Sequence, residues 1–352
     1  MSEHTNDGLP FEPSPLGDEE VSVEKSLRPR TLEEFIGQPR ILENLRIGIE
    51  AAKARSEPLD HVLFSGMPGL GKTTLSCLIA EAMGVELHQT SGPALVRKDI
   101  AGILTRLQHG DVFFIDEIHR VTPEAQEYLY SAMEDYRIEI TIDKGADARV
   151  VTLQIEPFTL VGATTREGLL SAPFRGRFGI IEKLEVYSPQ ELVEIIRRSA
   201  ALLVCSIDGP AAGLLAERCR GTPRYANRFL RRIRDVAQYR GNWRPGSSEP
   251  LVLTLGFVHE GLDRLEVDEH GLDRVDRSIL AVLLKSTEAV GVKTLAVSVG
   301  EEERTIEDVY EPYLIQRGML VKTPRGRRAS ALAAELYEEK NVAAEQQGEL
   351  SF

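Results

Sequence analysis

The chain has 352 residues, 42% hydrophobic and 28% charged, which is typical of a folded protein with more than one domain. Its formal net charge of −13 excludes a broadly basic protein that coats nucleic acid, but the two ends, residues 1–26 and 331–352, together carry twelve acidic residues against two lysines. The residues between these ends are nearly neutral, so a local basic surface for DNA is not excluded.

The two ends and the cysteines exclude several other classes of protein. Residues 1–26 lack the apolar core of a signal peptide and are predicted to be a disordered acidic leader, and residues 331–352 to be an acidic tail. The chain holds no run of 18 apolar residues, so no membrane span is predicted. Three scattered cysteines without CxxC spacing predict buried thiols rather than disulfides or a zinc site. We therefore expect a cytoplasmic protein.

From residue 27 to residue 187, short apolar runs alternate with helical patterns, and this segment is the first predicted domain. Because the runs are continuously apolar, they predict parallel strands buried on both faces, and hence an α/β domain. The predicted strands span residues 61–65, 111–115, 158–162 and 180–184.

The first apolar run leads into Gly66-Met-Pro-Gly-Leu-Gly-Lys-Thr73, a complete GxxxxGK[ST] pattern followed by a helical segment, residues 74–83. Its glycines let backbone N–H groups turn inward around a phosphate, at the positive end of the helix. Lys72 would place its charge between the β- and γ-phosphates, and the Thr73 hydroxyl would bind Mg²⁺. The alternative, a glycine-rich turn with a chance GKT, does not explain the flanking strand and helix.

Two carboxylates follow the second strand, in the string Asp111-Val-Phe-Phe-Ile-Asp-Glu-Ile-His119. They stand at the carboxyl end of a strand, where open α/β sheets bind ligands. Asp116 would hold Mg²⁺, and Glu117 would polarise an attacking water, which favours a hydrolase over a kinase. The alternative is that the two acids are solvated and cap the next helix.

An all-helical stretch then begins, with Ser188 as the expected N-cap and Pro189 at the first helical position. It predicts a small second domain, residues 188–258, and the turn-rich segment 242–250 predicts a break in the chain. Its helical patterns lie near residues 189–203, 208–220 and 222–240.

Residues 259–330 form the third predicted domain. Three helical patterns precede an apolar run from Met319 and a tight basic turn, residues 325–328. Three helices followed by a strand, a turn and a strand outline a winged helix. The helical patterns lie near residues 272–286, 293–299 and 303–317.

The phosphate loop and the string Phe114-Ile-Asp-Glu-Ile-His-Arg120 resemble those of the AAA+ superfamily of P-loop ATPases. Further strings, in order and spacing, resemble the RuvB family of Holliday-junction branch-migration motors from about Leu27 to Arg328. The departures are small: Met67 stands where the family usually has Pro, Phe174-Arg-Gly-Arg177 replaces Leu-Arg-Asp-Arg, and Lys322 replaces a common Arg. The matching strings are Leu27-Arg-Pro-Arg, Phe35-Ile-Gly-Gln38, Thr90-Ser-Gly-Pro93, Ala132-Met-Glu-Asp-Tyr136, Gly162-Ala-Thr-Thr-Arg166, Arg177-Phe-Gly179, Gly221-Thr-Pro-Arg224, Glu311-Pro-Tyr-Leu-Ile-Gln316 and Thr323-Pro-Arg-Gly-Arg327.

This resemblance implies a large ATPase domain, a small helical ATPase domain and a winged-helix head. It implies a Mg²⁺-dependent ATPase whose homohexameric rings encircle duplex DNA on two opposite arms of a four-way junction bound by RuvA. It further implies a role in recombination and DNA repair, with RuvC as another candidate partner.

The resemblance also implies roles for residues that chemistry alone specifies weakly. Arg177 would reach the γ-phosphate of the neighbouring subunit, with Arg175 as a second candidate, whereas sequence alone favours a surface ion pair for Arg177. Thr164 matches a nucleotide sensor at the end of a strand, and Arg224 matches a sensor that couples the small domain to the nucleotide. The nucleotide-binding positions are Leu27, Arg28, Gly66, Gly69, Gly71, Lys72, Thr73, Thr74, Glu134, Asp135, Tyr136, Tyr187 and Arg224.

Alternating apolar residues between 138 and 155 flank a turn with Gly145 and predict a β-hairpin. Exposed apolar residues on a hairpin are often a docking surface. The resemblance implies that RuvA binds this hairpin, and the alternative is that the hairpin packs on its own domain.

Residues 313–330 carry five cations and no acid. Gly326 would let the turn present Lys322, Arg325 and Arg327 to a phosphate backbone, whereas the preceding helix is acidic and poorly suited to reading bases. We therefore expect contacts to DNA that are not sequence-specific; the alternative is a solubilising charge run.

Three functions compete on this sequence: a DNA-translocating ATPase, a clamp-loader-type ATPase that opens a protein ring, and a nucleotide-dependent scaffold without activity. The winged helix with its basic turn favours the translocase over the clamp loader, which ends in a helical collar. Glu117 opposes the scaffold, because a scaffold needs no water-activating carboxylate.

Overall fold

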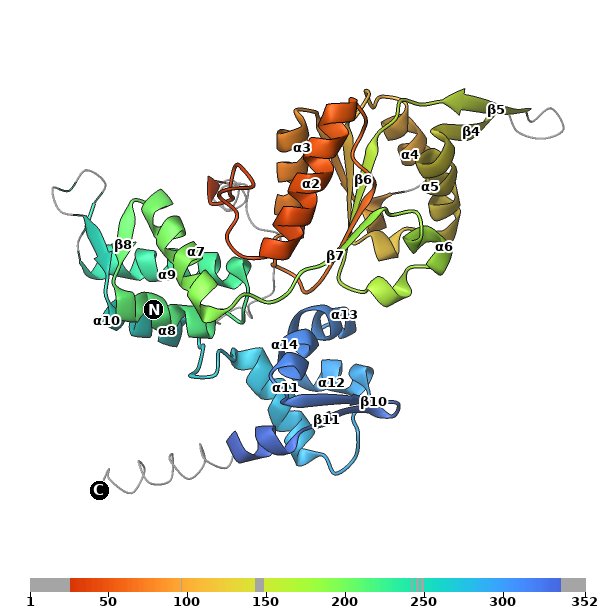
Figure 1. Ribbon diagram of the computed structural model, residues 1–352. Coiled ribbons are helices and arrows are strands. Elements are labelled where there is room, and N and C mark those ends of the chain that lie inside the picture. The colour runs from red at the N-terminus through yellow and green to blue at the C-terminus, as the bar shows by residue number, and fades with distance from the viewer. Residues whose placement is uncertain are drawn as a thin grey trace, which may run out of the picture.

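The structure, a computed structural model, describes residues 26–95, 97–142, 149–241, 243–244, 247 and 250–336, which form three parts (Figure 1). The expected acidic leader up to residue 25, the end of the acidic tail beyond residue 336 and the hairpin turn with Gly145 lie outside the described residues.

The large domain is built on a parallel sheet, as the apolar runs predict. All four predicted strands are present, and a fifth strand, β2, pairs with β3 at the edge of the sheet in the order β2-β3-β6-β1-β7. The sequence did not reveal β2 because its polar, half-exposed residues carry no apolar run. The strands are β1 (Val62–Ser65), β2 (Leu87–Ser91), β3 (Val112–Asp116), β6 (Thr159–Thr164) and β7 (Ile180–Lys183).

Helices cover both faces of this sheet, which explains the unbroken apolar strands. Successive residues of β1 point to opposite faces, so Phe64 joins one core with Leu75, whereas Leu63 joins a second core with Leu129. The helices are α2 (Pro39–Arg55), α3 (Lys72–Met83), α4 (Arg97–Leu104), α5 (Pro123–Asp135) and the short α6 (Ala172–Arg175), with 3₁₀ turns η1 (Gly92–Ala94), η2 (Ile118–Arg120) and η3 (Glu167–Leu169).

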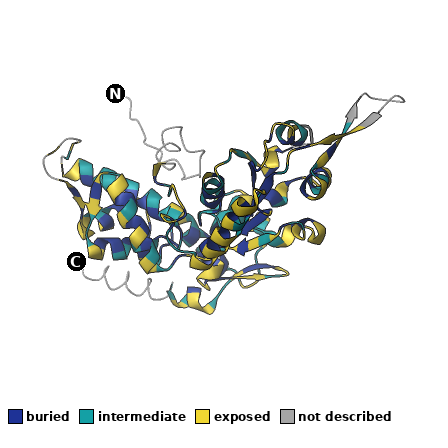
Figure 2. Cartoon of the chain, turned by 45° about the horizontal axis from the view of Figure 1, so that its top comes forward, coloured by how far each residue is buried: buried dark blue, intermediate teal, exposed yellow. Residues whose placement is uncertain are grey.

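The small domain is helical, as predicted. Ser188 caps its first helix through a capping box with Glu191, and Pro189 is the first helical residue. Its helices bury one face and expose the other, as the blue and yellow stripes in Figure 2 show. The elements are α7 (Pro189–Leu202), α8 (Gly209–Arg218), α9 (Pro223–Arg240), α10 (Leu255–Arg264) and a parallel pair of strands, β8 (Cys205–Ile207) and β9 (Leu251–Leu253).

The boundary after the small domain lies later than residue 258, where the sequence placed it. Helix α10 crosses that position, and its Val258 and Leu262 share a core with Phe229 and Ile233 of α9. The elements before and after the turn-rich segment 242–250 therefore belong to the same small domain, so the predicted break does not separate two domains.

The third domain has the predicted helices, strand, turn and strand. Its last helical region is interrupted by a π-helical segment, and β10 pairs antiparallel with β11. Residues 331–336 are helical and Ala333 is buried in this domain's core, so the acidic tail begins later than residue 331. The elements are α11 (Arg274–Lys285), α12 (Val292–Val299), α13 (Glu303–Thr305), η4 (Ile306–Tyr310), α14 (Glu311–Gln316), β10 (Leu320–Thr323) and β11 (Gly326–Ala329).

Two smaller expectations can be compared with the structure. Cys205 and Cys219 are buried free thiols, whereas Cys77 is half-buried. In the part of the chain that the structure describes, every helix is too short or too polar to span a lipid bilayer.

A buried arginine joins the small domain to the winged helix. Arg220, 3% exposed, donates to Asp273 at 2.7 Å and to Asp276 at 2.6 Å, and its side chain also donates to the Gly271 carbonyl. Burial raises the pKa of Asp276 to about 7, although the charge of Arg220 acts in the opposite direction. The two domains are thus joined by a buried ion pair. Removing either partner would leave the other charge buried without a counterion, at a large cost in stability.

We expect Arg220→Met to lower the free energy of unfolding by about 3–5 kcal/mol, because it leaves Asp276 buried without its counterion. Urea denaturation followed by the fluorescence of Trp243, the only tryptophan, measures this loss. Arg264→Met is the matched control, since Arg264 pairs with Glu260 on the surface and should cost less than about 1 kcal/mol. Equal losses in the two variants would contradict the prediction.

Candidate active site

The phosphate loop connects β1 to α3 in the conformation that its glycines allow. Gly69 and Gly71 have φ of 83° and 105°, a left-handed geometry that turns successive N–H groups to one side. A Cβ on Gly69 would lie 2.8 Å from the Cβ of Arg224, so glycine also admits the close approach of the small domain. No side chain caps the N-terminus of α3 at Gly71, so its first N–H groups face the loop.

Lys72 lies under this loop, 7% exposed, and donates to the carbonyl oxygens of Gly66 at 2.8 Å and Met67 at 2.9 Å. Burial lowers the pKa of Lys72 to about 8, although the nearby carboxylates of Glu117 and Asp116 favour its charged form. A polyphosphate would supply the negative charge that this buried lysine needs.

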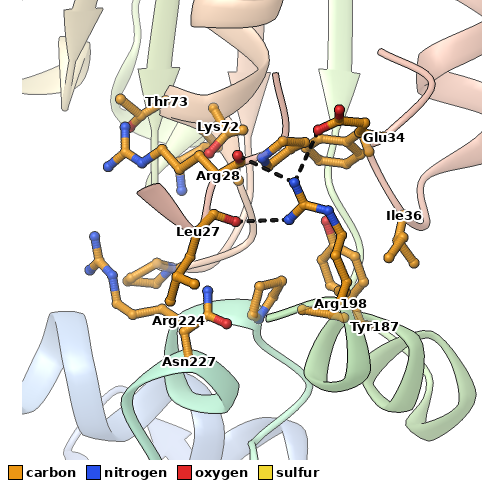
Figure 3. A pocket seen from close by; sticks show the side chains of 18 of the residues that line it. Leu27, Arg28, Glu34, Ile36, Lys72, Thr73, Tyr187, Arg198, Arg224 and Asn227 are labelled. Atoms are coloured by element: carbon orange, nitrogen blue, oxygen red, sulfur yellow. Dashed lines mark hydrogen bonds and ion pairs between the residues drawn. The ribbon is translucent and has the colours of Figure 1, made fainter. Parts of the chain in front are cut away.

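A pocket opens between the large and the small domain beside the phosphate loop (Figure 3). It brings together most of the sequence-predicted nucleotide residues, from the N-terminal segment, the loop, the end of β3 and the small domain. The predicted residues that line it are Leu27, Arg28, Gly69, Gly71, Lys72, Thr73, Thr74, Asp116, Glu117, Tyr187 and Arg224. Gly66 does not line it, but begins the loop and accepts the Lys72 hydrogen bond.

Tyr187 lines the pocket and also contacts the phosphate loop. Its hydroxyl donates to the carbonyl oxygen of Leu70 at 3.0 Å, and burial raises its pKa, so it remains a neutral donor at physiological pH. Its role in the structure is therefore to hold the phosphate loop as well as to line the pocket.

The two carboxylates at the end of β3 differ in their surroundings. Burial and the adjacent Glu117 raise the pKa of Asp116. Burial also opposes ionisation of Glu117, but hydrogen bonds from His119 and Thr165 outweigh it and hold its pKa below the ordinary value. The Nδ1 of His119 lies 3.1 Å from Oε2 of Glu117, and the Thr165 hydroxyl donates to the same oxygen at 3.1 Å. Glu117 is therefore an oriented, ionised carboxylate.

Thr164, the predicted nucleotide sensor, lies in this network and not in the pocket lining. Its hydroxyl is 2.9 Å from the Nδ1 of His119, and its carbonyl oxygen accepts from the Gly66 N–H at 3.2 Å. It thus lies between the acid pair and the start of the phosphate loop, in a position to respond to both.

These residues fit ATP with Mg²⁺. The inward N–H groups and Lys72 suit a polyphosphate, and the Thr73 hydroxyl with the Asp116 carboxylate offers the oxygen ligands that Mg²⁺ prefers alongside phosphate oxygens and water. No cluster of three His, Cys, Asp or Glu side chains that could hold a metal occurs among the described residues, so a metal here would depend on the nucleotide for its remaining ligands.

Besides Gly66 and Thr164, five further residues predicted for catalysis or nucleotide binding do not line this pocket. Arg175 pairs with Glu167, and Arg177 lies over the Tyr130 ring at 4.4 Å and pairs with Glu134 at 3.1 Å. Glu134 and Asp135 end α5, Tyr136 follows the helix, and all three lie outside the pocket lining. Sequence spacing alone could not show that these five residues lie away from the pocket of their own chain.

Sequence reasoning missed three residues with polar roles at the site. His119 and Thr165 orient Glu117, and Arg198 of α7 reaches the N-terminal segment. His119 and Thr165 adjoin the strand-end motifs, so the signal was their position two residues after Glu117 and one after Thr164. Arg198 gives no such signal, since it is one of several arginines on a helical surface.

The loop after β6 also contacts the winged helix. Arg166 donates to Glu307 at 3.1 Å and to Asp308 at 2.6 Å, both within η4. Because its own N–H donates to the Thr164 hydroxyl, the sensor position and the third domain are linked through one residue.

The wing differs from expectation at Arg327. Strand residues alternate in direction, so Arg328 is exposed whereas Arg327 is buried, pairing with Glu311 and, at 2.6 Å, with Glu307. The sequence placed Arg327 free on the wing; in this conformation the acidic helix beneath neutralises it. Lys322 pairs with Glu311 at 2.7 Å, and Arg325 is exposed at the turn.

Gly326 serves the packing of the wing. A Cβ at this position would lie 2.4 Å from the carbonyl oxygen of Val290, so only glycine admits the bridge between Val290 and Arg327. Its φ of 140° adds a backbone reason for glycine.

The predicted hairpin consists of β4 (Arg137–Ile142) and β5 (Arg149–Gln154), which extend away from the sheet (Figure 1). Ile138 at its base is buried in the domain core, whereas Val151 and Leu153 are 36% and 37% exposed. The base therefore packs on its own domain, and part of the hairpin presents apolar surface.

Comparison with known proteins follows the three domains. Residues 27–184 match the model of the Holliday junction DNA helicase RuvB P-loop domain, 187–268 the RuvB AAA lid domain, and 269–338 the RuvB C-terminal winged helix domain. The last two ranges agree with the later domain boundary and the later start of the tail described above.

The chain is also similar to whole proteins and to a solved structure. It is 53% identical to a Holliday junction branch migration complex subunit RuvB from Myxococcus xanthus, over 89% of this chain and 90% of that protein. It is 54% identical to the protein of the same description from Chlorobium luteolum, over 91% and 92%. The Thermotoga maritima RuvB Holliday junction branch migration motor matches with a TM-score of 0.78 and 45% identity, over 89% of this chain and 98% of that one. The chain therefore belongs to the RuvB family of P-loop AAA+ ATPases.

Proposed function

We propose that this chain hydrolyses ATP to drive DNA through a ring of its own copies, and so moves four-way junctions during recombination and repair. One observation carries this proposal. The same chain contains a phosphate loop beside an oriented carboxylate and a winged helix, and Arg166 links the winged helix to this site. A clamp-loader-type ATPase, the alternative, does not account for a winged helix with a basic turn.

The residues of the pocket divide the chemistry between them. The loop N–H groups and Lys72 bind the phosphates, and Tyr187 keeps the loop in place. Glu117, which lines the pocket, accepts a proton from the attacking water at the carboxylate oxygen that neither His119 nor Thr165 contacts. Thr73 and Asp116 would hold Mg²⁺, which would offset the negative charge that develops on the phosphates.

The remaining parts of the proposal concern partners. We infer that the copies form a homohexamer in which Arg177 serves the neighbouring pocket, that the hairpin with Val151 and Leu153 docks RuvA, and that RuvC is a further candidate partner. The exposed apolar side chains on the hairpin support the docking surface.

The test of the function is branch migration of a synthetic four-way junction with ATP and Mg²⁺, with and without RuvA. We expect ATP-dependent conversion to duplex products, and none with a non-hydrolysable analogue. ATP hydrolysis without junction movement in both conditions would favour the clamp-loader-type alternative.

The wing makes a prediction about DNA affinity. Lys322→Ala with Arg325→Ala should weaken duplex binding and reduce the slope of log affinity against log salt by about 2, because each phosphate contact contributes about 0.9. Arg327 is left intact, since its removal together with Lys322 would leave Glu311, 1% exposed, without either of its cationic partners. Arg240→Ala with Arg264→Ala removes the same charge from the small domain and should leave the slope unchanged. An unaltered slope in the wing variant would disprove phosphate contact there.

A further inference from the structure

Arg198 of α7 ties the small domain to the N-terminal segment of the large domain that lines the pocket (Figure 3). Its guanidinium donates to the carbonyl oxygen of Leu27 at 2.8 Å, to that of Arg28 at 3.4 Å and to the Glu34 carboxylate at 3.1 Å. The side chain is only 25% exposed, and it lines the pocket itself. A single guanidinium group therefore donates hydrogen bonds to three acceptors on the large domain.

Arg198 adds polar contacts to a segment that otherwise packs through apolar side chains, since Leu27, Leu32 and Phe35 are buried. Residues 27–36 form neither strand nor continuous helix, so the carbonyls of Leu27 and Arg28 are not used by regular secondary structure. Glu34, the third acceptor, also accepts from the Arg30 N–H at 2.9 Å, which closes the segment on itself. Removing Arg198 would thus remove these hydrogen bonds between the segment and the small domain at Leu27, Arg28 and Glu34.

The same helix also fixes a second pocket residue. Ser199, fully buried, donates to the side-chain oxygen of Asn227 at 2.7 Å, and Asn227 lines the pocket. With its oxygen engaged, the amide is left to donate. Arg198 and Ser199 thus order pocket residues outside the phosphate loop, where the nucleoside rather than the phosphates would lie.

We propose that Arg198 is a positioning residue for ATP: it holds the Leu27–Glu34 segment against the small domain, so that the nucleoside end of the pocket is formed before the nucleotide binds. This inference rests on the proposed function, because it assigns a role within the nucleotide site. It predicts that loss of Arg198 affects the two parts of the nucleotide differently. Affinity for the nucleoside depends on Arg198, and affinity for the phosphates does not.

The test compares ADP with inorganic tripolyphosphate by titration calorimetry in the presence of Mg²⁺. Arg198→Met keeps the aliphatic stem and removes the donors, and we expect it to weaken ADP binding about 10- to 100-fold, since hydrogen bonds from a charged group are lost. Tripolyphosphate binding should change less than about twofold. In turnover, KM for ATP should rise by a similar factor while kcat at saturation stays within about threefold.

Arg197→Met is the matched control, because Arg197 is exposed on the same helix and does not line the pocket. Glu34→Gln is the second variant; it keeps Arg198 and should weaken ADP binding in the same sense by less. Equal losses for ADP and tripolyphosphate, or no loss for ADP, would overturn the positioning role. Wild-type protein that binds neither ligand would instead overturn the proposed function.

Discussion

Arg177→Ala is expected to bind ATP with near-normal affinity but to hydrolyse it about 10³–10⁵-fold more slowly, the range found for arginine fingers. In its own chain Arg177 lies against Tyr130 and Glu134 and does not line the pocket that holds Lys72. Any catalytic role must therefore be exerted on another copy, where its charge would offset the charge developing on the transferred phosphoryl group. Steady-state and single-turnover hydrolysis, with ATP affinity measured separately, check this expectation.

Mixing subunits distinguishes action on a neighbour from a structural role. Arg177→Ala keeps an intact Glu117, and Glu117→Gln keeps an intact Arg177, so mixed rings should contain complete sites that neither variant forms alone. We expect the mixture to hydrolyse ATP at a rate well above the sum of its parts. A rate equal to that sum would contradict action between subunits.

Arg175→Ala resolves the pair of candidates that the sequence left open. Arg175 is 47% exposed and pairs with Glu167 of its own chain at 3.4 Å, whereas Arg177 is 21% exposed. A surface pair of this kind contributes about 0–1 kcal/mol, so we expect Arg175→Ala to change hydrolysis less than about fivefold. If both variants were equally impaired, the two arginines would share the role.

The features predictable from sequence were those with a local chemical pattern. The phosphate loop, the acid pair and the capped helix at Ser188 each depend on residues within a few positions of one another. The spacing of these residues was therefore enough to predict the local structure. Strands buried on both faces were equally predictable because each is a continuous apolar run. The polar edge strand β2 lacks that run and gave no signal.

The features that sequence could not supply are contacts between residues far apart in the chain. Arg198 and Leu27 are 171 positions apart, and Arg166 and Asp308 are 142 apart. Arg327 shows the same limit: its basic neighbours predicted an exposed wing, but the pleat of β11 and the acid at position 311 decided its burial. A run of basic residues predicts an exposed basic surface only when the element that packs against it is known.

Glu117→Gln is expected to bind ATP and to hydrolyse it about 10²–10⁴-fold more slowly, the contribution typical of a positioned general base. The change removes the negative charge and the proton-accepting oxygen but keeps the shape that contacts Thr165 at 3.1 Å. Because Lys72 and Thr73 remain, ADP affinity should stay within about threefold of wild type. Rapid-quench hydrolysis and calorimetry measure the two quantities on the same preparation.

The outcome of this substitution also separates catalysis from assembly. Glu127→Gln, an exposed carboxylate on α5, is the matched control and should leave the rate unchanged. His119→Ala removes a donor to Glu117 without removing the carboxylate, so it should slow hydrolysis by less than Glu117→Gln.

Since the wing lies on another domain, Glu117→Gln should retain the salt slope of DNA binding while junctions no longer move. Normal turnover in Glu117→Gln would show that the proton is accepted elsewhere and that the oriented carboxylate serves structure alone.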